Sequence, residues 1–239
     1  MKRILVMSDI HANYPALRAI AEQVDPDRFD RIVHAGDLTV YGTFPNETIA
    51  WFRKRRNAVS VRGNTDRRVL RLFAGTPLTK PRKETKRAMY YWTQQVLLPR
   101  HVRFLERLPD RADFRLGGIR VRVLHGDSGD GESAGADPMP GLPGRGDEQS
   151  GVDLLITGHT HEPVHEVVGG VHHVNPGSVG RMFDGDPRAS YAILTIGRKG
   201  IEVEHRRVAY PVEETAEGIR KHRLPAIFAE MFRQGRKLS

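Results

Sequence analysis

The stretch RIVHAGD, residues Arg31 to Asp37, decides how this chain is interpreted. Its mostly apolar beginning predicts a buried strand of the kind found in parallel sheets. The strand stops at Gly36, and Asp37 follows at the carboxyl end, which is where open α/β sheets bind ligands. A single aspartate after a strand is more often part of a turn or a helix cap. The stretch therefore indicates a binding site only if the same pattern recurs in the chain.

The pattern does recur, at four other places in the sequence. The apolar runs at residues 4–8, 58–62, 119–124 and 153–157 are followed by Asp9-Ile10-His11, Gly63-Asn64-Thr65-Asp66, His125-Gly126-Asp127 and Gly158-His159-Thr160-His161. Five apolar runs that each finish in Asp, Asn or His place ligating side chains at the ends of strands. This recurrence predicts a metal site.

The predicted ligands supply oxygen and nitrogen but no sulfur. They are Asp9, His11, Asp37, Asn64, His125, His159 and His161. Imidazole together with carboxylate suits borderline divalent ions, and we expect Mn²⁺ first, with Fe²⁺, Co²⁺, Ni²⁺ or Zn²⁺ as alternatives. Seven ligands are too many for one such ion and suit two ions that share a carboxylate. Two metals about 3.5–4 Å apart are a known device for in-line attack at phosphorus.

The composition is that of a soluble globular protein, and we expect one α/β domain over residues 1–239. Of the 239 residues, 38% are hydrophobic and 28% are charged, and the longest apolar runs are too short to span a bilayer. No membrane partner is therefore expected. The absence of cysteine excludes disulfides, thiolate ligands and a cysteine nucleophile, and it favours a cytoplasmic location.

The formal net charge of +9 predicts polyanionic partners such as nucleotides or other phosphorylated molecules. Nucleic acid is a weaker expectation, because the basic residues are spread along the chain and no aromatic and basic pattern of an RNA-recognition module is visible. A nucleic-acid processing factor would also need an added recognition domain, for which the chain has no length left.

The order of elements predicts a parallel sheet followed by a helical segment. Strands and helices alternate up to Arg62 in the order β-α-β-α-β, which builds parallel pairing. Asn13 is expected to cap the first helix. Residues 66–109 are predicted to be largely helical, because Gly and Pro are absent from residues 83–98 and apolar residues recur there at spacings of three and four.

The second half of the chain is richer in strands. We predict a β-hairpin at residues 114–124, short strands between residues 164 and 208 that form a second sheet, and helices at residues 212–221 and 225–232. Residues 128–151 are dominated by Gly, Pro, Asp and Ser and interrupt two strands that lead into the metal site. A loop of this length in a compact domain is usually functional or disordered, and we expect a mobile edge to the site.

The ordered motifs resemble the calcineurin-like metallophosphoesterase superfamily, specifically its small bacterial and archaeal phosphodiesterase-like branch. The match spans about Met1 to Ala192, since Asn175-Pro176-Gly177-Ser178 and residues 92–109 also look like that branch. Each motif alone is weak, but the five in this order are specific. The fold implied by the resemblance is a sandwich of two mixed β-sheets flanked by helices.

The resemblance also implies roles for the ligands. Asp9, His11, Asp37 and His161 would bind the first metal, and Asp37, Asn64, His125 and His159 the second, with Asp37 as the bridge. A hydroxide between the ions would be the nucleophile, which makes Asp37, Asn64 and His125 the expected catalytic residues. Arg62, Asn175 and Arg181 are candidate substrate contacts.

One position departs from the family pattern. Many members carry a histidine directly after the motif asparagine, where it protonates the leaving group, but this chain has Thr65. A threonine hydroxyl is a poor general acid. The general acid is therefore not assigned, and Thr65, Asp66 and His34 are the candidates to test. Otherwise His34 is expected to be a strand histidine that is hydrogen-bonded to the backbone.

Three functions are weighed on these grounds. The first is a dinuclear-metal phosphodiesterase, a metal-dependent hydrolase that cleaves P–O bonds. The alternative enzyme hydrolyses dinucleoside polyphosphates, which the basic charge suits. The non-enzymatic alternative is a metal-free scaffold on the same fold, in which substituted ligands are expected. All seven ligands are intact, which favours an enzyme.

Overall fold

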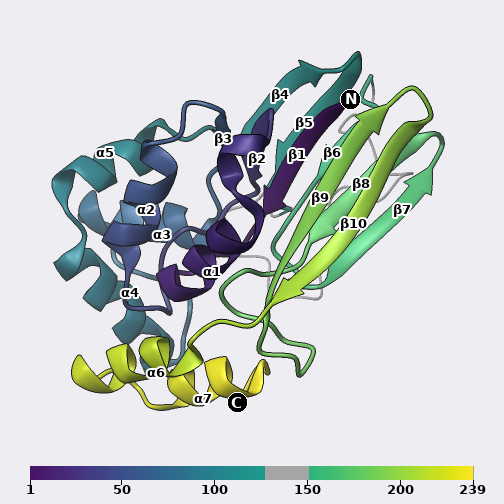
Figure 1. The fold of residues 1–239 in the computed structure, drawn as a ribbon. Helices are drawn as coiled ribbons and strands as arrows, with labels where there is room; N and C mark the ends of the chain where they lie inside the picture. Colours follow the sequence, from purple (N-terminus) through teal and green to yellow (C-terminus); the bar gives the residue numbers. More distant parts are fainter. Residues whose placement is uncertain (127–150, 239) are drawn as a thin grey trace.

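The computed structural model describes residues 1–126 and 151–238 (Figure 1). The Gly- and Pro-rich segment predicted over residues 128–151 lies, apart from Gly151, outside the described residues.

Two five-stranded sheets form the centre of the molecule. The first has the strand order β10-β9-β1-β2-β3. Its strands are β1 (Lys2–Met7), β2 (Arg31–His34), β3 (Ala58–Ser60), β9 (Ala189–Gly197) and β10 (Gly200–Val208). The three strands β1, β2 and β3 are parallel, as the alternation of strands and helices predicts, while β9 is antiparallel to β1.

The second sheet has the order β4-β5-β6-β8-β7. Its strands are β4 (Arg111–Leu116), β5 (Ile119–Leu124), β6 (Leu154–Ile156), β7 (Pro163–Val168) and β8 (Val171–Pro176). The inner strands β5, β6 and β8 are parallel, and the outer strands β4 and β7 are antiparallel to their neighbours. The β4–β5 pair is the predicted hairpin.

Helices cover the outer face of the first sheet (Figure 1). They are α1 (Tyr14–Val24), α2 (Pro45–Arg53), α3 (Asn64–Phe73), α4 (Glu84–Val96), α5 (Pro99–Arg107), α6 (Val212–Lys221) and α7 (Ile227–Gln234), with a short 3-10 turn at Pro26–Arg28. The helices predicted within residues 66–109 and near the carboxyl end are therefore confirmed. Asn13 caps α1 as predicted, because its side chain accepts a hydrogen bond from the Ala16 backbone N–H.

The alternation of side chains along β1 explains how the layers are held together. Ile4 and Val6 point to one face and pack with Val121 and Leu154 of the second sheet, in a core that lies between the sheets. Leu5 points to the other face and joins the larger core under the helices. The two mixed sheets with flanking helices are the predicted sandwich.

One part of the predicted topology is wrong. The strands between residues 164 and 208 do not all form the second sheet, because β9 and β10 return to the first. The register pairs Ala192 with Val6 and Leu194 with Ile4. β9 is buried over most of its length, which suits a strand with neighbours on both edges, whereas β10 alternates between exposed and half-buried residues. Side-chain alternation fixes the faces of a strand but does not identify its neighbours.

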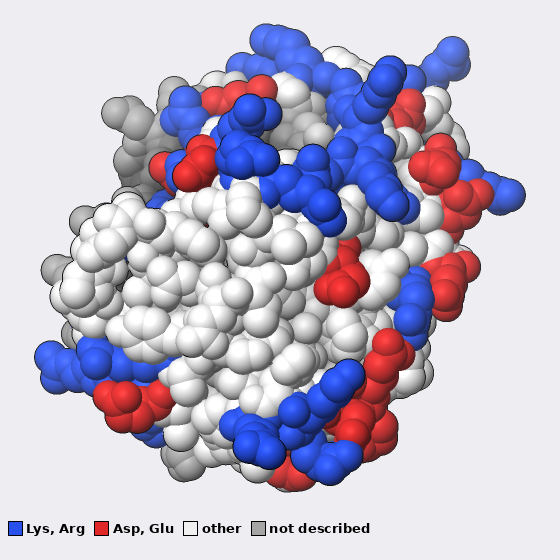
Figure 2. Space-filling view, turned by 90° about the vertical axis from the view of Figure 1, so that its left-hand side faces the viewer, with Lys and Arg blue, Asp and Glu red and all other residues white. Residues whose placement is uncertain are grey.

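Charged side chains are unevenly spread over the helical side of the molecule. Figure 2 shows charged side chains of both signs along the top, the right-hand side and the bottom of this face, around an area without them. In the part of the chain that the structure describes, no helix is long and apolar enough to cross a membrane.

Candidate metal centre

The predicted ligands follow strands of both sheets and converge where those strands end. Asp9 and His11 follow β1, Asp37 follows β2, Asn64 begins α3 after β3, His125 follows β5, and His159 and His161 follow β6. Parallel strands that end together bring their following loops to one edge of the sheet. The two sheets therefore each contribute part of a single site.

A first group of ligand atoms contains Asp9, His11 and His161. His161 Nε2 lies 3.3 Å from Asp9 Oδ1, and His11 Nε2 lies 3.8 Å from the same oxygen. The Nε2 atoms of the two histidines are 3.2 Å apart. All three side chains are buried.

A second group contains Asp9, Asp37 and His125, so the two groups share Asp9. His125 Nε2 lies 3.4 Å from Asp37 Oδ2 and 3.9 Å from Asp9 Oδ1. Asp37 Oδ2 is also 3.8 Å from His11 Nε2, which places this carboxylate between the two groups.

Asn64 and His159 extend the second group. Asn64 Oδ1 lies 3.1 Å from His125 Nε2 and 3.0 Å from His159 Nδ1. The amide can also turn over, so that its nitrogen faces both histidines and its oxygen accepts from Arg68 Nη1. In the first orientation Asn64 offers an oxygen ligand. The structure thus brings together all seven residues that were predicted from the sequence as metal ligands.

Backbone carbonyls orient three of the histidines. His125 Nδ1 lies 2.7 Å from the Ala35 oxygen, and His11 Nδ1 lies 3.3 Å from the Thr39 oxygen. His161 Nδ1 is hydrogen-bonded to the carbonyl of Arg181. A carbonyl can only accept, so each Nδ1 carries the proton and each Nε2 is turned toward the centre. This is the usual arrangement of histidines that bind metals.

One carboxylate oxygen of Asp9 shows that a cation would fit in the centre. Asp9 Oδ2 accepts from Ser8 Oγ at 2.6 Å and from the His159 N–H at 3.0 Å. Asp9 Oδ1 is buried and has no hydrogen-bond partner among the described residues. A buried carboxylate oxygen without a donor is unfavourable. Since it faces Nε2 atoms of three histidines, the residues present fit divalent metal ions.

The charges in the centre are strongly coupled. Burial alone would raise the pKa of Asp37, but the neighbouring His125 outweighs burial and holds the pKa well below its usual range. Burial alone would lower the pKa of His125, but Asp37 raises it to about 10. Burial lowers the pKa of His11 to about 3. Without metal, a proton on His125 therefore offsets part of the carboxylate charge, and metal binding must release it.

The backbone is strained at most of the ligands. Five of them have a positive φ angle: Asp9 (53°), His11 (51°), Asp37 (63°), His159 (73°) and His161 (65°). Residues other than glycine rarely adopt this region, and such strain concentrates at functional sites.

Glycines before two ligands allow the close approach of these loops. A Cβ atom on Gly63 would lie 2.0 Å from Asp37 Oδ1. A Cβ atom on Gly158 would lie 1.9 Å from Ser8 Oγ and 2.9 Å from Asp9 Oδ2. Only glycine fits at these positions.

Comparison with known proteins identifies the family. A family model described as the calcineurin-like phosphoesterase superfamily domain matches residues 1–199. The chain belongs to this superfamily. The resemblance found in the motifs is thereby confirmed, and the protein is a member of a family of metal-dependent hydrolases that act on phosphate esters.

Individual relatives match most of the chain. The uncharacterized protein MJ0912 of Methanocaldococcus jannaschii is 30% identical over 251 residues, which cover 98% of each chain. The phosphodiesterase YfcE of Escherichia coli is 30% identical over 205 residues, which cover 81% of this chain and 88% of YfcE.

Solved structures share the fold. A metallophosphoesterase from Sphaerobacter thermophilus has 29% identity and a TM-score of 0.73, with 98% of this chain and 99% of that chain covered. The hypothetical protein PH1004 of Pyrococcus horikoshii has 19% identity and a TM-score of 0.81 over the full length of both chains.

Asp66, one of the candidate general acids, lies buried beneath the loop that carries Asp37. Its Oδ2 accepts from the backbone N–H groups of Gly63, Asp37 and Leu38 at 3.1–3.2 Å. Its Oδ1 accepts from both the N–H and the hydroxyl of Thr39. Burial and the charge of Asp37 raise the pKa of Asp66 to about 6. Both oxygens are engaged in holding the backbone of the metal-binding loop.

Thr65 is also buried and supports the same loop. Its backbone N–H donates to Asp37 Oδ1 at 2.8 Å, and its hydroxyl donates to the Thr39 carbonyl at 3.3 Å. His34 is fully buried against the ring of Phe52, and burial lowers its pKa to about 3. Contrary to expectation, neither ring nitrogen of His34 has a hydrogen-bond partner of good geometry among the described residues.

The three candidate substrate contacts have different surroundings. Asn175 is buried, and its amide donates to the Gly158 carbonyl at 2.8 Å, so it supports the loop of His159. Arg181 is buried over the ring of Tyr41.

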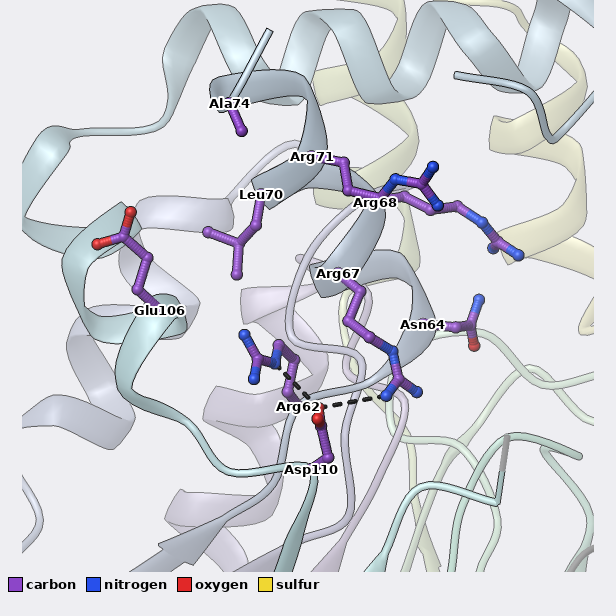
Figure 3. A pocket seen from close by; sticks show the side chains of 9 residues that line it. All are labelled: Arg62, Asn64, Arg67, Arg68, Leu70, Arg71, Ala74, Glu106 and Asp110. Carbon is purple, nitrogen blue, oxygen red and sulfur yellow. Dashed lines mark hydrogen bonds and ion pairs between the residues drawn. The ribbon is translucent and has the colours of Figure 1, made fainter. Parts of the chain in front are cut away.

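Arg62 lines a pocket of about 470 Å³ that begins beside Asn64. Four arginines line this pocket (Figure 3): Arg62, Arg67, Arg68 and Arg71. Arg62 and Arg67 point to the carboxylate of Asp110 and pair with it, while Arg68 extends on the side of Asn64.

Sequence reasoning missed the residues that position the ligands. Ser8 holds Asp9, and Thr39 carries the carbonyl that orients His11. No motif marks Thr39, because its partner His11 lies 28 residues away in the sequence. Ser8 directly precedes Asp9, but its residue type alone does not show that it holds the carboxylate. Arg68 did carry a signal: it follows Asn64 by four residues on α3, and residues four apart share one face of a helix.

Proposed function

We propose that this protein is a phosphodiesterase that uses two divalent metal ions, with Mn²⁺ as the preferred ion. The observation that carries the proposal is the pair of overlapping ligand groups, which share Asp9 and have Asp37 between them. In this assignment Asp9, His11, Asp37 and His161 hold one ion, and Asp37, Asn64, His125 and His159 hold the other. The similarity to the phosphodiesterase YfcE supports the reaction class.

The ions, when bound, would polarise the phosphoryl oxygens and lower the pKa of water enough for attack at neutral pH. The protein's own contribution is to hold the ligands in place before substrate arrives. Thr65 N–H fixes Asp37 Oδ1, which leaves Oδ2 facing the histidines. Ser8 and the His159 N–H fix Asp9 Oδ2 and leave Oδ1 for a cation.

None of the three candidates for the general acid, Thr65, Asp66 and His34, is placed to protonate a leaving group. The hydroxyl of Thr65 and both oxygens of Asp66 are engaged with the loop at residues 37–39, and His34 is buried against α2. We infer that the leaving oxygen departs unassisted or takes a proton from water. Substrates whose leaving group is a stable anion are therefore preferred, such as aryl diesters and phosphoanhydrides.

A dinucleoside polyphosphate hydrolase is the second candidate. The arginine-lined pocket beside Asn64 favours it, because a polyphosphate chain offers several anionic groups to guanidinium side chains. The scaffold alternative is disfavoured, since all seven ligands are present and converge.

Hydrolysis assays test the proposal directly. The Mn²⁺-loaded protein is expected to hydrolyse bis-p-nitrophenyl phosphate, to lose this activity on chelation, and to regain it when Mn²⁺ is restored. Diadenosine tetraphosphate and p-nitrophenyl phosphate are assayed in parallel. Absence of Mn²⁺-dependent hydrolysis of all three compounds would overturn the assignment as a phosphoesterase.

A further inference from the structure

Four cationic side chains outside the ligand set gather beside the metal centre. They are Arg68 on α3, Lys86 on α4, Arg181 after β8 and Lys237 after α7. We call them the cationic cluster. They come from four separate segments of the chain, so their proximity is a product of the fold and not of the local sequence.

Three aromatic residues lie next to members of the cationic cluster. The Arg181 guanidinium carbon lies 3.9 Å from the centre of the Tyr41 ring and 5.0 Å from that of Phe183. Lys237 Nζ lies 5.9 Å from the same Phe183 ring. Arg68 Nη1 donates to the Tyr90 hydroxyl at 3.4 Å, and the rings of Tyr90 and Tyr41 are 6.2 Å apart.

The same rings and helix connect the cluster to the metal ligands. The Tyr41 ring lies 5.2 Å from that of His11, and the Phe183 ring stacks on His161 at 4.3 Å. Arg68 lies one helical turn after Asn64 and comes within 2.6 Å of its amide in the turned orientation. The cluster therefore borders both groups of ligands.

The charges of the cluster are not neutralised by the protein. Within residues 1–126 and 151–238, none of its four members forms an ion pair with Asp or Glu, whereas nearby Arg62 and Arg67 share Asp110. Arg181 is only 6% exposed, and its Nε has no hydrogen-bond partner among the described residues. Burial lowers the pKa of Lys86, and the charges of Arg181, Lys237, Lys83 and Arg68 lower it further.

An anion would relieve this imbalance. Of the four members, Arg181 is buried, Arg68 and Lys86 are half-buried and Lys237 is exposed. A buried cation such as Arg181 is unfavourable unless it meets a counter-charge. The charge of the Asp37 carboxylate raises the pKa of both Arg68 and Arg181, but this carboxylate already faces His11 and His125. Bound metal ions would add more positive charge. A monoanionic phosphodiester supplies one negative charge, which is too little for such a site.

We propose that the cationic cluster binds a second anionic group of the substrate, so that the natural substrates carry at least one phosphate group besides the scissile one. The inference rests on the proposed function, because it assumes that the scissile phosphate lies at the metal centre. It selects nucleotides and other compounds with two or more phosphate groups over simple diesters.

Equilibrium binding to the Mn²⁺-loaded protein tests this inference without turnover. The probes are methylenebisphosphonate, with two linked phosphonate groups, and inorganic phosphate, with one. The variants are Lys86→Gln and Arg68→Gln. The matched controls are Lys199→Gln and Arg198→Gln, which remove the same charges from the exposed turn between β9 and β10, at the end of β9 remote from the site.

We expect each cluster variant to weaken bisphosphonate binding about tenfold relative to phosphate binding, which corresponds to the loss of one charge-assisted contact. The control variants should change neither bisphosphonate binding nor phosphate binding. Metal content is measured in every variant, so that loss of an ion is not mistaken for loss of the anion site. If the preference for bisphosphonate is the same in both cluster variants as in the controls, the inference is wrong.

Kinetics separate this inference from the proposed function. In the cluster variants, the ratio of kcat/KM for diadenosine tetraphosphate to kcat/KM for bis-p-nitrophenyl phosphate should fall about tenfold. A protein that hydrolyses the diester but shows no change in this ratio would contradict the cluster's role alone. A protein without Mn²⁺-dependent hydrolysis would contradict the proposed function instead.

Discussion

We expect the presence of Thr65, a poor general acid, to limit which leaving groups the enzyme can release. Its hydroxyl donates to the Thr39 carbonyl, and the contact that matters for the metal centre comes from its backbone N–H to Asp37. Thr65→Val keeps that N–H, so we expect activity on bis-p-nitrophenyl phosphate to stay within about fivefold, since a neutral hydrogen bond contributes about 1 kcal/mol. Steady-state kinetics with a check of metal content measure this.

The lack of an assigned general acid also predicts that the enzyme prefers aryl diesters to alkyl esters. General acid catalysis contributes about 10²–10⁴-fold. Without it, alkyl esters should be hydrolysed at least about a hundredfold more slowly than aryl diesters. Equal rates on both would reveal an acid elsewhere, and a collapse of aryl hydrolysis in Thr65→Val with metals retained would show that Thr65 itself takes part.

A substitution at Asp66 shows whether its carboxylate positions the metal-binding loop or acts as the general acid. Replacing its carboxylate in Asp66→Asn turns an NH₂ group toward backbone N–H donors of the Asp37 loop, which leaves buried donors unpaired. We expect a loss of stability of about 1–3 kcal/mol together with weaker metal binding. Thermal unfolding and metal titration measure the two effects. If stability and metal binding were unchanged while only alkyl ester hydrolysis fell, Asp66 would be the general acid.

At the scale of elements, the centre depends on loops that pass very close to one another. Gly158→Ala would drive a methyl group into Ser8 and Asp9, which shape the metal site. We expect metal affinity to fall at least about tenfold, in the range seen when support for metal ligands is disturbed. Gly197→Ala is the matched control, because its Cβ would have only an ordinary contact, 3.7 Å from Met1. Equal metal affinity in both variants would show that the loop tolerates the displacement.

The convergence of the candidate ligands could be predicted from the sequence because the residues that end each strand form a local pattern. An apolar run followed by Asp37, or by His159 and His161, is local information, and the parallel order of strands brings such ends to one edge. The placement of β9 could not be predicted in the same way. Its neighbours β1 and β10 are chosen by packing across the whole domain, and its alternation fits either sheet.

The supporting residues were unpredictable for a related reason. The position of Asp66 near Asn64 in the sequence suggests a general acid. In the structure, its carboxylate accepts a hydrogen bond from the backbone N–H of Asp37, 29 residues away. Arg181 was nominated as a phosphate contact, and only the fold shows that it is buried over Tyr41 without a carboxylate partner in the described chain. Such contacts depend on residues that meet only after folding.

At the scale of the whole molecule, the metal ions should couple the two sheets. The ligands come from the ends of β1 and β2 in the first sheet and of β5 and β6 in the second, so bound ions join both. An ion that binds only the folded state stabilises it by about 2.7 kcal/mol at a hundredfold excess over Kd. For a domain of this size we expect Mn²⁺ to raise Tm by about 5–10 °C. Differential scanning calorimetry with and without Mn²⁺ tests this, and an unchanged Tm would argue against ions that bridge the sheets.

We propose that the seven ligands hold two divalent ions with Asp37 between them. The most direct measurement is the metal content of the Mn²⁺-loaded protein after removal of free ions, determined by elemental analysis for the wild type and for Asp37→Asn. We predict close to two Mn²⁺ per wild-type chain and less than one in Asp37→Asn, which should also be inactive, because a bridging carboxylate serves both ions. A wild-type protein that retains no Mn²⁺, or an Asp37→Asn variant with full metal content and full activity, would contradict the account.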